Sequence, residues 1–553
     1  MNMSNDRKYL LALPLVAALF LVIGLWTGIS FSTGNQKSKA REKLDHVFDI
    51  IEETYVDPVD FDSLVELTIP ELLSNLDPHS AYIAETEREE ADRDLEGSFF
   101  GVGIQFEMVD DTLSVMEVVT GGPAEEAGIL PGDRFIEVDG RKIAGTGVLN
   151  TDIMKMLRGE ENTTVHIRVK RLSSPKLLDF DIVRGVVPVS HIDASYLIND
   201  TIGYVRLGKF SENSYSEFLQ ALSQLKYDGA KSFIVDLRDN GGGYMNPAVL
   251  IANEFFEPGK IIVMTKGKHR YDDSVLLSDG TGSFTDNKVV VLVNEFTASS
   301  SEILAGALQD NDRALIVGRR TFGKGLVQRS FEFPDSSEMR LTVQRYYTPS
   351  GRCIQKTYQP GKKTDYDFEI IGRYDRGEIF SADSIKIDST LIFTTGTGRN
   401  VYGGGGIIPD IFVPSDTAGV TSYYIKVANA GLLRKFAYEY ADLNRDRLNE
   451  ARNTGEMLGM LPADNILLQS FVNYAATKGK VPPRWYYINI SAPLIVNQIK
   501  ALIARDIVGM DGYFEIINSS DPVVSEAIRQ IESGGADFPL SDRNTTPEAV
   551  AQE

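Results

Sequence analysis

Strands and helices alternate along residues 186–416, and this alternation limits the fold more than any other feature of the chain. Apolar runs such as "SFIVDLRDN" and "KVVVLVNE" are followed by stretches with helical spacing, "NPAVLIANEFFE" and "SSEILAGALQD". Strands connected through helices form mainly parallel sheets with helices packed on them. We therefore expect an α/β core, in which the polar and irregular residues 357–402 are an insertion.

Other patterns flank this core, and 553 residues exceed the length of about 250 at which one core stops growing. Apolar positions recur at helical spacing in residues 35–95 and 420–533, whereas residues 96–172 hold short β-like runs between glycine turns. The last 20 residues lack a core pattern and are predicted to be disordered. The expected division of the chain is 1–34, 35–95, 96–172, 173–419, 420–533 and 534–553.

The N-terminal segment is long and apolar. Residues 9–31 carry no charge, and a helix of that length can cross about 30 Å of hydrocarbon. A cleaved signal peptide is the alternative, although its apolar region is normally shorter. We expect a membrane anchor, with the rest of the chain outside the cytoplasm. The net charge of -22 makes nucleic acid a poor partner, and the single cysteine, Cys353, excludes an intrachain disulfide.

Four hydroxyl side chains gather where one strand ends and a helix begins. The run "VVVLVN" leads into "EFTASSSEI", which contains Thr297, Ser299, Ser300 and Ser301. A serine at such a turn is exposed at the edge of the sheet, and the amide after it lies where a helix N-terminus favours negative charge. A helix cap is the alternative role. None of the five histidines lies in a recognisable triad context, so a nucleophilic serine needs another base.

The segment "TFGKGLVQ" offers such a base in Lys324. A lysine accepts a proton only when burial has lowered its pKa from about 10.4 by several units. Gln328 is placed to orient the amine, while the alternative is a solvated lysine in a turn. The glycines that end "DLRDNGGG" let backbone N–H groups approach a substrate oxygen, or equally a phosphate.

These segments occur in an order that resembles a known family. "TASSSEILAGALQDNDRALIVGRRTFGKGLVQ", "DLRDNGGG", "LDPHSAY", "YYTPSGRCIQK" and "GGGGIIPDI" resemble the carboxyl-terminal processing (tail-specific) serine peptidases. The resemblance implies a crotonase-like or ClpP-like α/β core, without metal or organic cofactor. It also implies a catalytic set of Ser299, Lys324 and Gln328. The implied oxyanion donors are Gly242 or Gly243 and the amide of Ser300, which replaces the family's usual alanine.

The segment "GGPAEEAGILPGDRFIEVDG" resembles the PDZ domain of the same family. The loop "FGVGI" offers the amides of Gly101, Val102, Gly103 and Ile104 to a terminal carboxylate, and a bound peptide extends an adjacent strand. Candidate pocket residues for the last side chain of the peptide are Ile104, Phe106, Ile153 and Leu157, with a plain core role as the alternative.

The expected protein is a serine endopeptidase that captures protein C-termini and is anchored in a bacterial inner membrane with its catalytic part in the periplasm. A catalytically silent PDZ adaptor is one alternative, which the Ser299, Lys324 and Gln328 set disfavours. A crotonase-type acyl-thioester enzyme is another, and it leaves the PDZ segment unexplained. The substrates, the need for an activator or adaptor, the oligomeric state and the role of the C-terminal helices stay open.

Overall fold

The computed structural model describes residues 39–93, 97–172 and 174–538. The chain divides into two compact units, of which the first runs to Leu72 and the second begins at Leu73. The described part of the first unit consists of α2 (Lys39–Thr54) and most of α3 (Phe61–Ser74). The expected membrane anchor at 9–31 lies outside the described residues, so its existence stays a prediction.

A six-stranded sheet forms the centre of the second unit. Its order is β10 (Ile192–Asn199), β11 (Ile202–Leu207), β12 (Ser232–Asp236), β15 (Lys288–Val293), β16 (Leu315–Gly318) and β21 (Ile411–Phe412). Only β10 and β11 pair in antiparallel fashion, and the remaining pairs are parallel. The sheet confirms the predicted α/β core.

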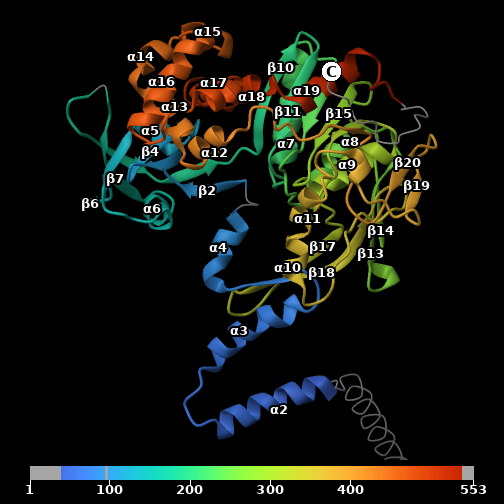
Figure 1. The fold of residues 1–553 in the computed structure, drawn as a ribbon. Coiled ribbons are helices and arrows are strands. Elements are labelled where there is room, and N and C mark those ends of the chain that lie inside the picture. The colour runs from blue at the N-terminus through green and yellow to red at the C-terminus, as the bar shows by residue number, and fades with distance from the viewer. Residues whose placement is uncertain (1–38, 94–96, 173, 539–553) are drawn as a thin grey trace, which may run out of the picture. The chain divides into compact units, whose positions relative to one another are not determined.

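Helices cover this sheet, as Figure 1 shows for α7 (Ser214–Tyr227), α8 (Met245–Asn253) and α9 (Ser300–Asp310). In β15 the five residues after Lys288 are all buried, because a strand covered on both faces has no solvent side. The continuous apolar run therefore marks this strand as central. The carboxyl end of β15 delivers the chain to α9 at Ser299.

A second, antiparallel sheet lies in the same unit and was not predicted from the sequence. It consists of β1 (Ala81–Ile83), β18 (Glu338–Tyr347), β13 (Ile261–Gly267), β14 (Ser274–Leu277) and β17 (Leu326–Glu332). The long strand β18 pairs with β17 along one edge and with β1 and β13 along the other. This arrangement brings the turn before β1 close to Gln328 on β17.

The region after residue 97 forms a third sheet. It contains β3 (Ile104–Val109), β4 (Thr112–Val118), β5 (Arg134–Val138), β7 (Thr164–Lys170) and β8 (Leu178–Val183), with β6 (Arg141–Lys142) on β5. Beside it are α5 (Pro123–Ala127), α6 (Asn150–Leu157) and the pair β2 (Ser98–Gly101) and β9 (Gly185–Pro188). The sheet continues past the expected limit at residue 172, because β8 pairs with β7 along its length.

The C-terminal region is helical, as predicted. The helices are α12 (Ser422–Asn429), α13 (Leu432–Leu443), α14 (Arg445–Leu448), α15 (Thr454–Met460), α16 (Asp464–Thr477), α17 (Trp485–Val508), α18 (Met510–Asn518) and α19 (Pro522–Glu532). Within the described part of the chain, α17 is the one helix long and apolar enough to span a membrane, but half of its most apolar window is buried. Its buried side chains belong to the core of this helical region.

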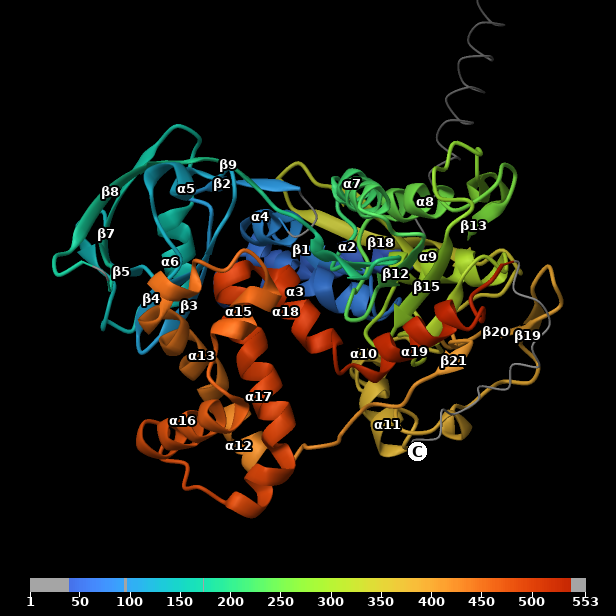
Figure 2. The same cartoon turned by 90° about the horizontal axis from the view of Figure 1, so that it is seen from above.

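The C-terminal helices contact both neighbouring parts of the second unit. Figure 2 shows α13 beside β3 and β4, and α19 beside β15. The guanidinium of Arg134 donates to Asp442 on α13 at 3.0 Å. At the other end, Val523 and Val524 of α19 join a buried cluster with Val290 and Leu292 of β15. The helical region therefore connects the third sheet to the central sheet.

The segment expected to be an insertion packs onto the core. It holds α10 (Lys363–Asp367), α11 (Glu369–Asp375), the 3-10 turn η2 (Ala382–Ser384), β19 (Ile392–Thr394) and β20 (Asn400–Tyr402). The buried guanidinium of Arg373 donates to the carbonyls of Thr321 at 2.7 Å and Phe322 at 2.9 Å. These contacts fix the main chain just before Lys324.

Candidate active site

A cavity of about 760 Å³ brings the predicted site residues together. Residues from the central sheet, the antiparallel sheet and the turn before β1 line it. Those named in advance from the sequence are Ser299, Ser300, Lys324, Gln328, Gly242 and Gly243. The cavity also contains His79 and Tyr346, to which sequence reasoning gave no role. Side chains separated by more than 200 residues in the chain thus face one space.

Ser299 lies at a strained turn between β15 and α9. Its φ of 57° and ψ of -117° are unusual for a residue with a side chain. Backbone strain of this kind persists only where surrounding contacts enforce it, and it gathers at functional sites. The buried hydroxyl of Tyr346 supplies one such contact, because it lies 3.0 Å from the carbonyl of Ser299 and 2.7 Å from that of Lys324.

The three neighbouring hydroxyls serve the structure. The Thr297 hydroxyl donates to the carbonyl of Leu237 at 2.8 Å, and that of Ser301 donates to Asn240 at 3.0 Å. The Ser300 hydroxyl donates to the carbonyl of Gly243 at 2.8 Å. All three side chains are buried, whereas Ser299 is partly exposed to the cavity. Geometry therefore separates Ser299 from the other candidates.

The glycine loop packs against the Ser299 turn. Gly242 and Gly243 have φ values of 100° and 143°, and a Cβ on Gly242 would lie 2.7 Å from that of Ser299. The amide of Gly242 donates to Asn240 Oδ1 at 2.8 Å. The amides of Gly243 and Ser300 have no protein acceptor among the residues that the structure describes. These two donors are thus available to a substrate oxygen.

A buried carboxylate that sequence reasoning missed holds the site together. Glu302 Oε2 accepts from the amides of Ser299 at 2.9 Å and Lys324 at 2.8 Å. Its Oε1 accepts from the Thr321 hydroxyl at 2.5 Å and the Gly323 amide at 2.8 Å. One side chain therefore fixes the main chain of both predicted catalytic residues. The available signal was the spacing Ser-x-x-Glu from Ser299, which is typical of a capping box.

Burial alters the charge states of several groups in the cavity. Burial lowers the pKa of Lys324, while the carboxylates of Glu302 and Asp77 act in the opposite direction. Burial also raises the pKa of Glu302. A lysine with a lowered pKa is more readily neutral, which is the form that can accept a proton.

His79 lies at the cavity, although no histidine of the sequence lies in a recognisable triad context. Burial, followed by the nearby charge of Lys324, lowers its pKa to about 3. Its Nε2 lies 2.9 Å from the hydroxyl of Tyr366. A base with so low a pKa accepts a proton poorly at neutral pH, so Lys324 is the better candidate.

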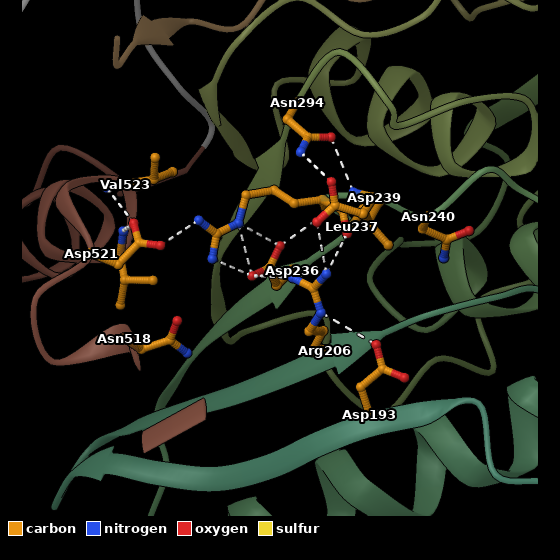
Figure 3. A network of polar contacts seen from close by, with 12 residues as sticks. Asp193, Arg206, Asp236, Leu237, Asp239, Asn240, Asn294, Asn518, Asp521 and Val523 are labelled. Atoms are coloured by element: carbon orange, nitrogen blue, oxygen red, sulfur yellow. Dashed lines mark hydrogen bonds and ion pairs between the residues drawn. The ribbon is translucent and has the colours of Figure 1, made fainter. Parts of the chain in front are cut away.

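An ion-pair network supports the main chain that leads into the glycine loop (Figure 3). The carboxylate of Asp236 is fully buried and bonds to Arg206 at 3.2 Å and Arg238 at 2.5 Å. Burial raises the pKa of Asp236, but the two guanidinium groups more than offset this and lower it to about 2. Arg238 also bonds to Asp521, the N-cap of α19, at 2.6 Å. The C-terminal helices are thereby tied to the end of β12.

The predicted peptide-binding residues are divided between a core and an edge strand. Val102, Ile153 and Leu157 are buried in the core of the third sheet, while Ile104 and Phe106 are only partly buried. Both of these lie on β3, which stands at the end of the sheet order. Gly103 has a φ of 79°, as a tight loop before an edge strand requires. An edge strand can accept a peptide as an additional strand.

Comparisons with known proteins agree with this architecture. Peptidase family S41 matches residues 201–368, a PDZ domain matches 101–182, and a family of unknown function (DUF8443) matches 423–509. A carboxy-terminal-processing protease of Bartonella bacilliformis is 34% identical over 62% of this chain and 79% of its own length. The carboxy-terminal processing protease CtpA of Bacillus subtilis is 34% identical over 59% of this chain and 68% of its own length.

A solved structure extends the comparison. The photosystem II D1 C-terminal processing protease is 30% identical, covers 58% of this chain and 84% of its own, and gives a TM-score of 0.34. The family and sequence matches define a serine-type protease with a PDZ domain. The chain belongs to the carboxy-terminal-processing proteases of peptidase family S41. The family predicted from the sequence is thereby confirmed.

Proposed function

We propose that the chain is a serine endopeptidase in which Ser299 is the nucleophile and Lys324 the general base, with Gln328 orienting the amine. The observation that carries this proposal is the cavity shared by all three residues. Ser299 is the one hydroxyl of its cluster that is not buried, and burial lowers the pKa of Lys324. A nucleophile and a base with a shifted pKa in one cleft are the parts that acyl transfer requires.

The chemistry follows from these positions. Neutral Lys324 takes the proton of the Ser299 hydroxyl, whose oxygen attacks the scissile carbonyl. The amides of Gly243 and Ser300 stabilise the resulting oxyanion, since the Gly242 amide is already bonded to Asn240. Lysine then returns the proton to the leaving amine, and water hydrolyses the acyl-enzyme by the reverse sequence of proton transfers.

The PDZ domain supplies substrate selection in this proposal. The amides of residues 101–104 bind the terminal carboxylate, and the peptide pairs with the edge strand β3. Ile104 and Phe106 contact its last side chain, above a core that contains Ile153 and Leu157. The uncharged segment 9–31 anchors the enzyme in the bacterial inner membrane, so its substrates are periplasmic proteins with free C-termini.

A direct test compares serine variants on one polypeptide with a free apolar C-terminus. Ser299→Ala is expected to abolish hydrolysis, because loss of a nucleophile costs several orders of magnitude. The same variant is expected to bind a tail peptide as tightly as the parent enzyme. If Ser299→Ala hydrolysed the polypeptide at the parental rate, the nucleophile would be wrong. If the parent bound tails but cleaved nothing, the adaptor alternative would hold instead.

A further inference from the structure

The turn 76–80, within the motif "LDPHSAY", lies beside the cavity although the proposed mechanism gives it no role. The buried Asp77 carboxylate organises this turn. Its Oδ1 accepts from the amides of His79 and Ser80, both at 2.9 Å, and its Oδ2 accepts from the Ser80 hydroxyl at 2.6 Å. The same Oδ1 also accepts from the Thr342 hydroxyl at 3.0 Å, a contact that closing the turn does not require.

Thr342 occupies a gap in the pairing of β18. Along one edge of this strand, Arg340 pairs with Ala81 of β1 and Gln344 pairs with Gly267 of β13. The amide of Thr342 falls between these partners and donates to the Ser80 hydroxyl at 3.1 Å. On the opposite edge of β18, Thr342 pairs with Gln328 of β17. Thr342 therefore stands between the turn and the predicted orienting glutamine.

The hydrogens in this chain of contacts can be assigned from the chemistry of the groups. Burial would raise the pKa of Asp77, but hydrogen bonds from Ser80, His79 and Thr342 lower it overall, so the carboxylate is ionised at neutral pH. An ionised carboxylate only accepts, so the single hydroxyl hydrogen of Thr342 points to Asp77. The Thr342 oxygen is then left to accept, and it does so from Gln328 Nε2 at 3.2 Å.

We propose that Asp77 and Thr342 are positioning residues for the proposed base. Asp77 fixes the hydroxyl of Thr342, and that hydroxyl holds the amide nitrogen of Gln328 so that the amide oxygen Oε1 is directed to the amine of Lys324. With Oε1 accepting one N–H of the neutral amine, the lone pair of Lys324 is free for the Ser299 proton. This inference rests on the proposed roles of Ser299, Lys324 and Gln328.

The test uses Thr342→Val, which keeps the shape of the side chain and removes its hydroxyl. We expect kcat to fall about tenfold or more with KM unchanged, since contacting residues couple by up to about a hundredfold. Thr342→Ser is expected to recover most of this loss. Asp77→Asn, which removes the fixed acceptor, is expected to lower kcat in the same way. Thermal midpoints and tail-peptide affinity establish that the variants are folded.

A matched control exists on the same sheet. Thr265 of β13 accepts from Gln344 Nε2, also at 3.2 Å, but neither residue lines the cavity. Thr265→Val removes the same kind of contact and is expected to leave kcat unchanged. If kcat fell equally in Thr265→Val and Thr342→Val, the loss would come from a less stable sheet, and the inference would be overturned.

A double variant completes the test. If Thr342 acts through Gln328, adding Thr342→Val to Gln328→Ala lowers kcat no further. A full additional loss on that background, or parental kcat in Thr342→Val alone, would overturn the inference while leaving the proposed catalytic set intact. Parental kcat in Gln328→Ala is a different outcome, because it would remove the proposed role of Gln328 itself.

Discussion

Replacing Glu302 by glutamine tests how the nucleophile and the base are held together. The carboxylate accepts four hydrogen bonds, two at each oxygen. A glutamine amide must turn its NH₂ group toward one of these pairs. If it faces the amides of Ser299 and Lys324, both lose their acceptor. If it faces Thr321 and Gly323, the hydroxyl can turn to accept but the Gly323 amide cannot.

The second orientation costs less free energy, so it sets the lower limit of the loss of stability. One buried donor left without an acceptor costs about 1–3 kcal/mol. We therefore expect Glu302→Gln to lower the free energy of unfolding by about 2 kcal/mol. Turnover should fall as well. Even the less costly orientation leaves the Gly323 amide without its acceptor and so releases the main chain next to Lys324.

Urea unfolding gives the change in stability, and kcat is measured on the same variants far below the unfolding midpoint. Glu295→Gln is the matched control, since Glu295 is buried near the same turn but bonds to the side chains of Arg319 at 2.8 Å and Tyr374 at 2.8 Å. It is expected to lose stability without a fall in kcat. Unchanged stability and unchanged kcat in Glu302→Gln would show that the Glu302 carboxylate does not hold the two catalytic residues in place.

Three further predictions concern the base, the substrate tail and the C-terminal helices. The acylation rate, measured in the pre-steady state, should rise with pH through a Lys324 pKa below its ordinary value, because the neutral amine is the active form. Lys324→Arg should be nearly inactive, since an arginine stays protonated. Amidating the substrate C-terminus should reduce kcat/KM about tenfold or more without changing the cleaved bond, and Ile104→Asp should reduce discrimination between apolar and acidic tails. Asp521→Ala removes both the cap of α19 and one of the two carboxylate partners of Arg238, so urea unfolding should show a loss of about 1–3 kcal/mol. An unchanged midpoint would contradict that assignment.

Local sequence patterns were sufficient to predict much of the fold. The uninterrupted apolar run of β15 indicated a buried strand, and the serine turn that follows it was expected at the edge of the sheet. Ser299, Lys324 and the glycine loop could be predicted as site residues because each lies within one short, continuous sequence motif. The structure adds that Gly242 donates to Asn240, which leaves Gly243 as the available glycine amide.

The pairing of strands that lie far apart in the sequence could not be predicted from local sequence patterns. The antiparallel sheet joins strands that start at Ala81 and end at Tyr347, and neither β1 nor β18 has a pattern that names its partner. For that reason the approach of Asp77 and His79 to Lys324 could not be predicted from local patterns. Glu302 was overlooked for another reason, since its Ser-x-x-Glu spacing is equally typical of an ordinary helix cap.

In the proposed mechanism an acyl-enzyme forms on Ser299 with Lys324 as its base. This acyl-enzyme can be located by trapping the full chain with a serine-reactive acylating probe, in the parent enzyme and in Lys324→Ala, followed by peptide mapping by mass spectrometry. We expect one adduct, located on Ser299, and a labelling rate that is lower by orders of magnitude in Lys324→Ala. An adduct on Ser300 or Ser301, or equal labelling rates in the two proteins, would contradict the proposed mechanism.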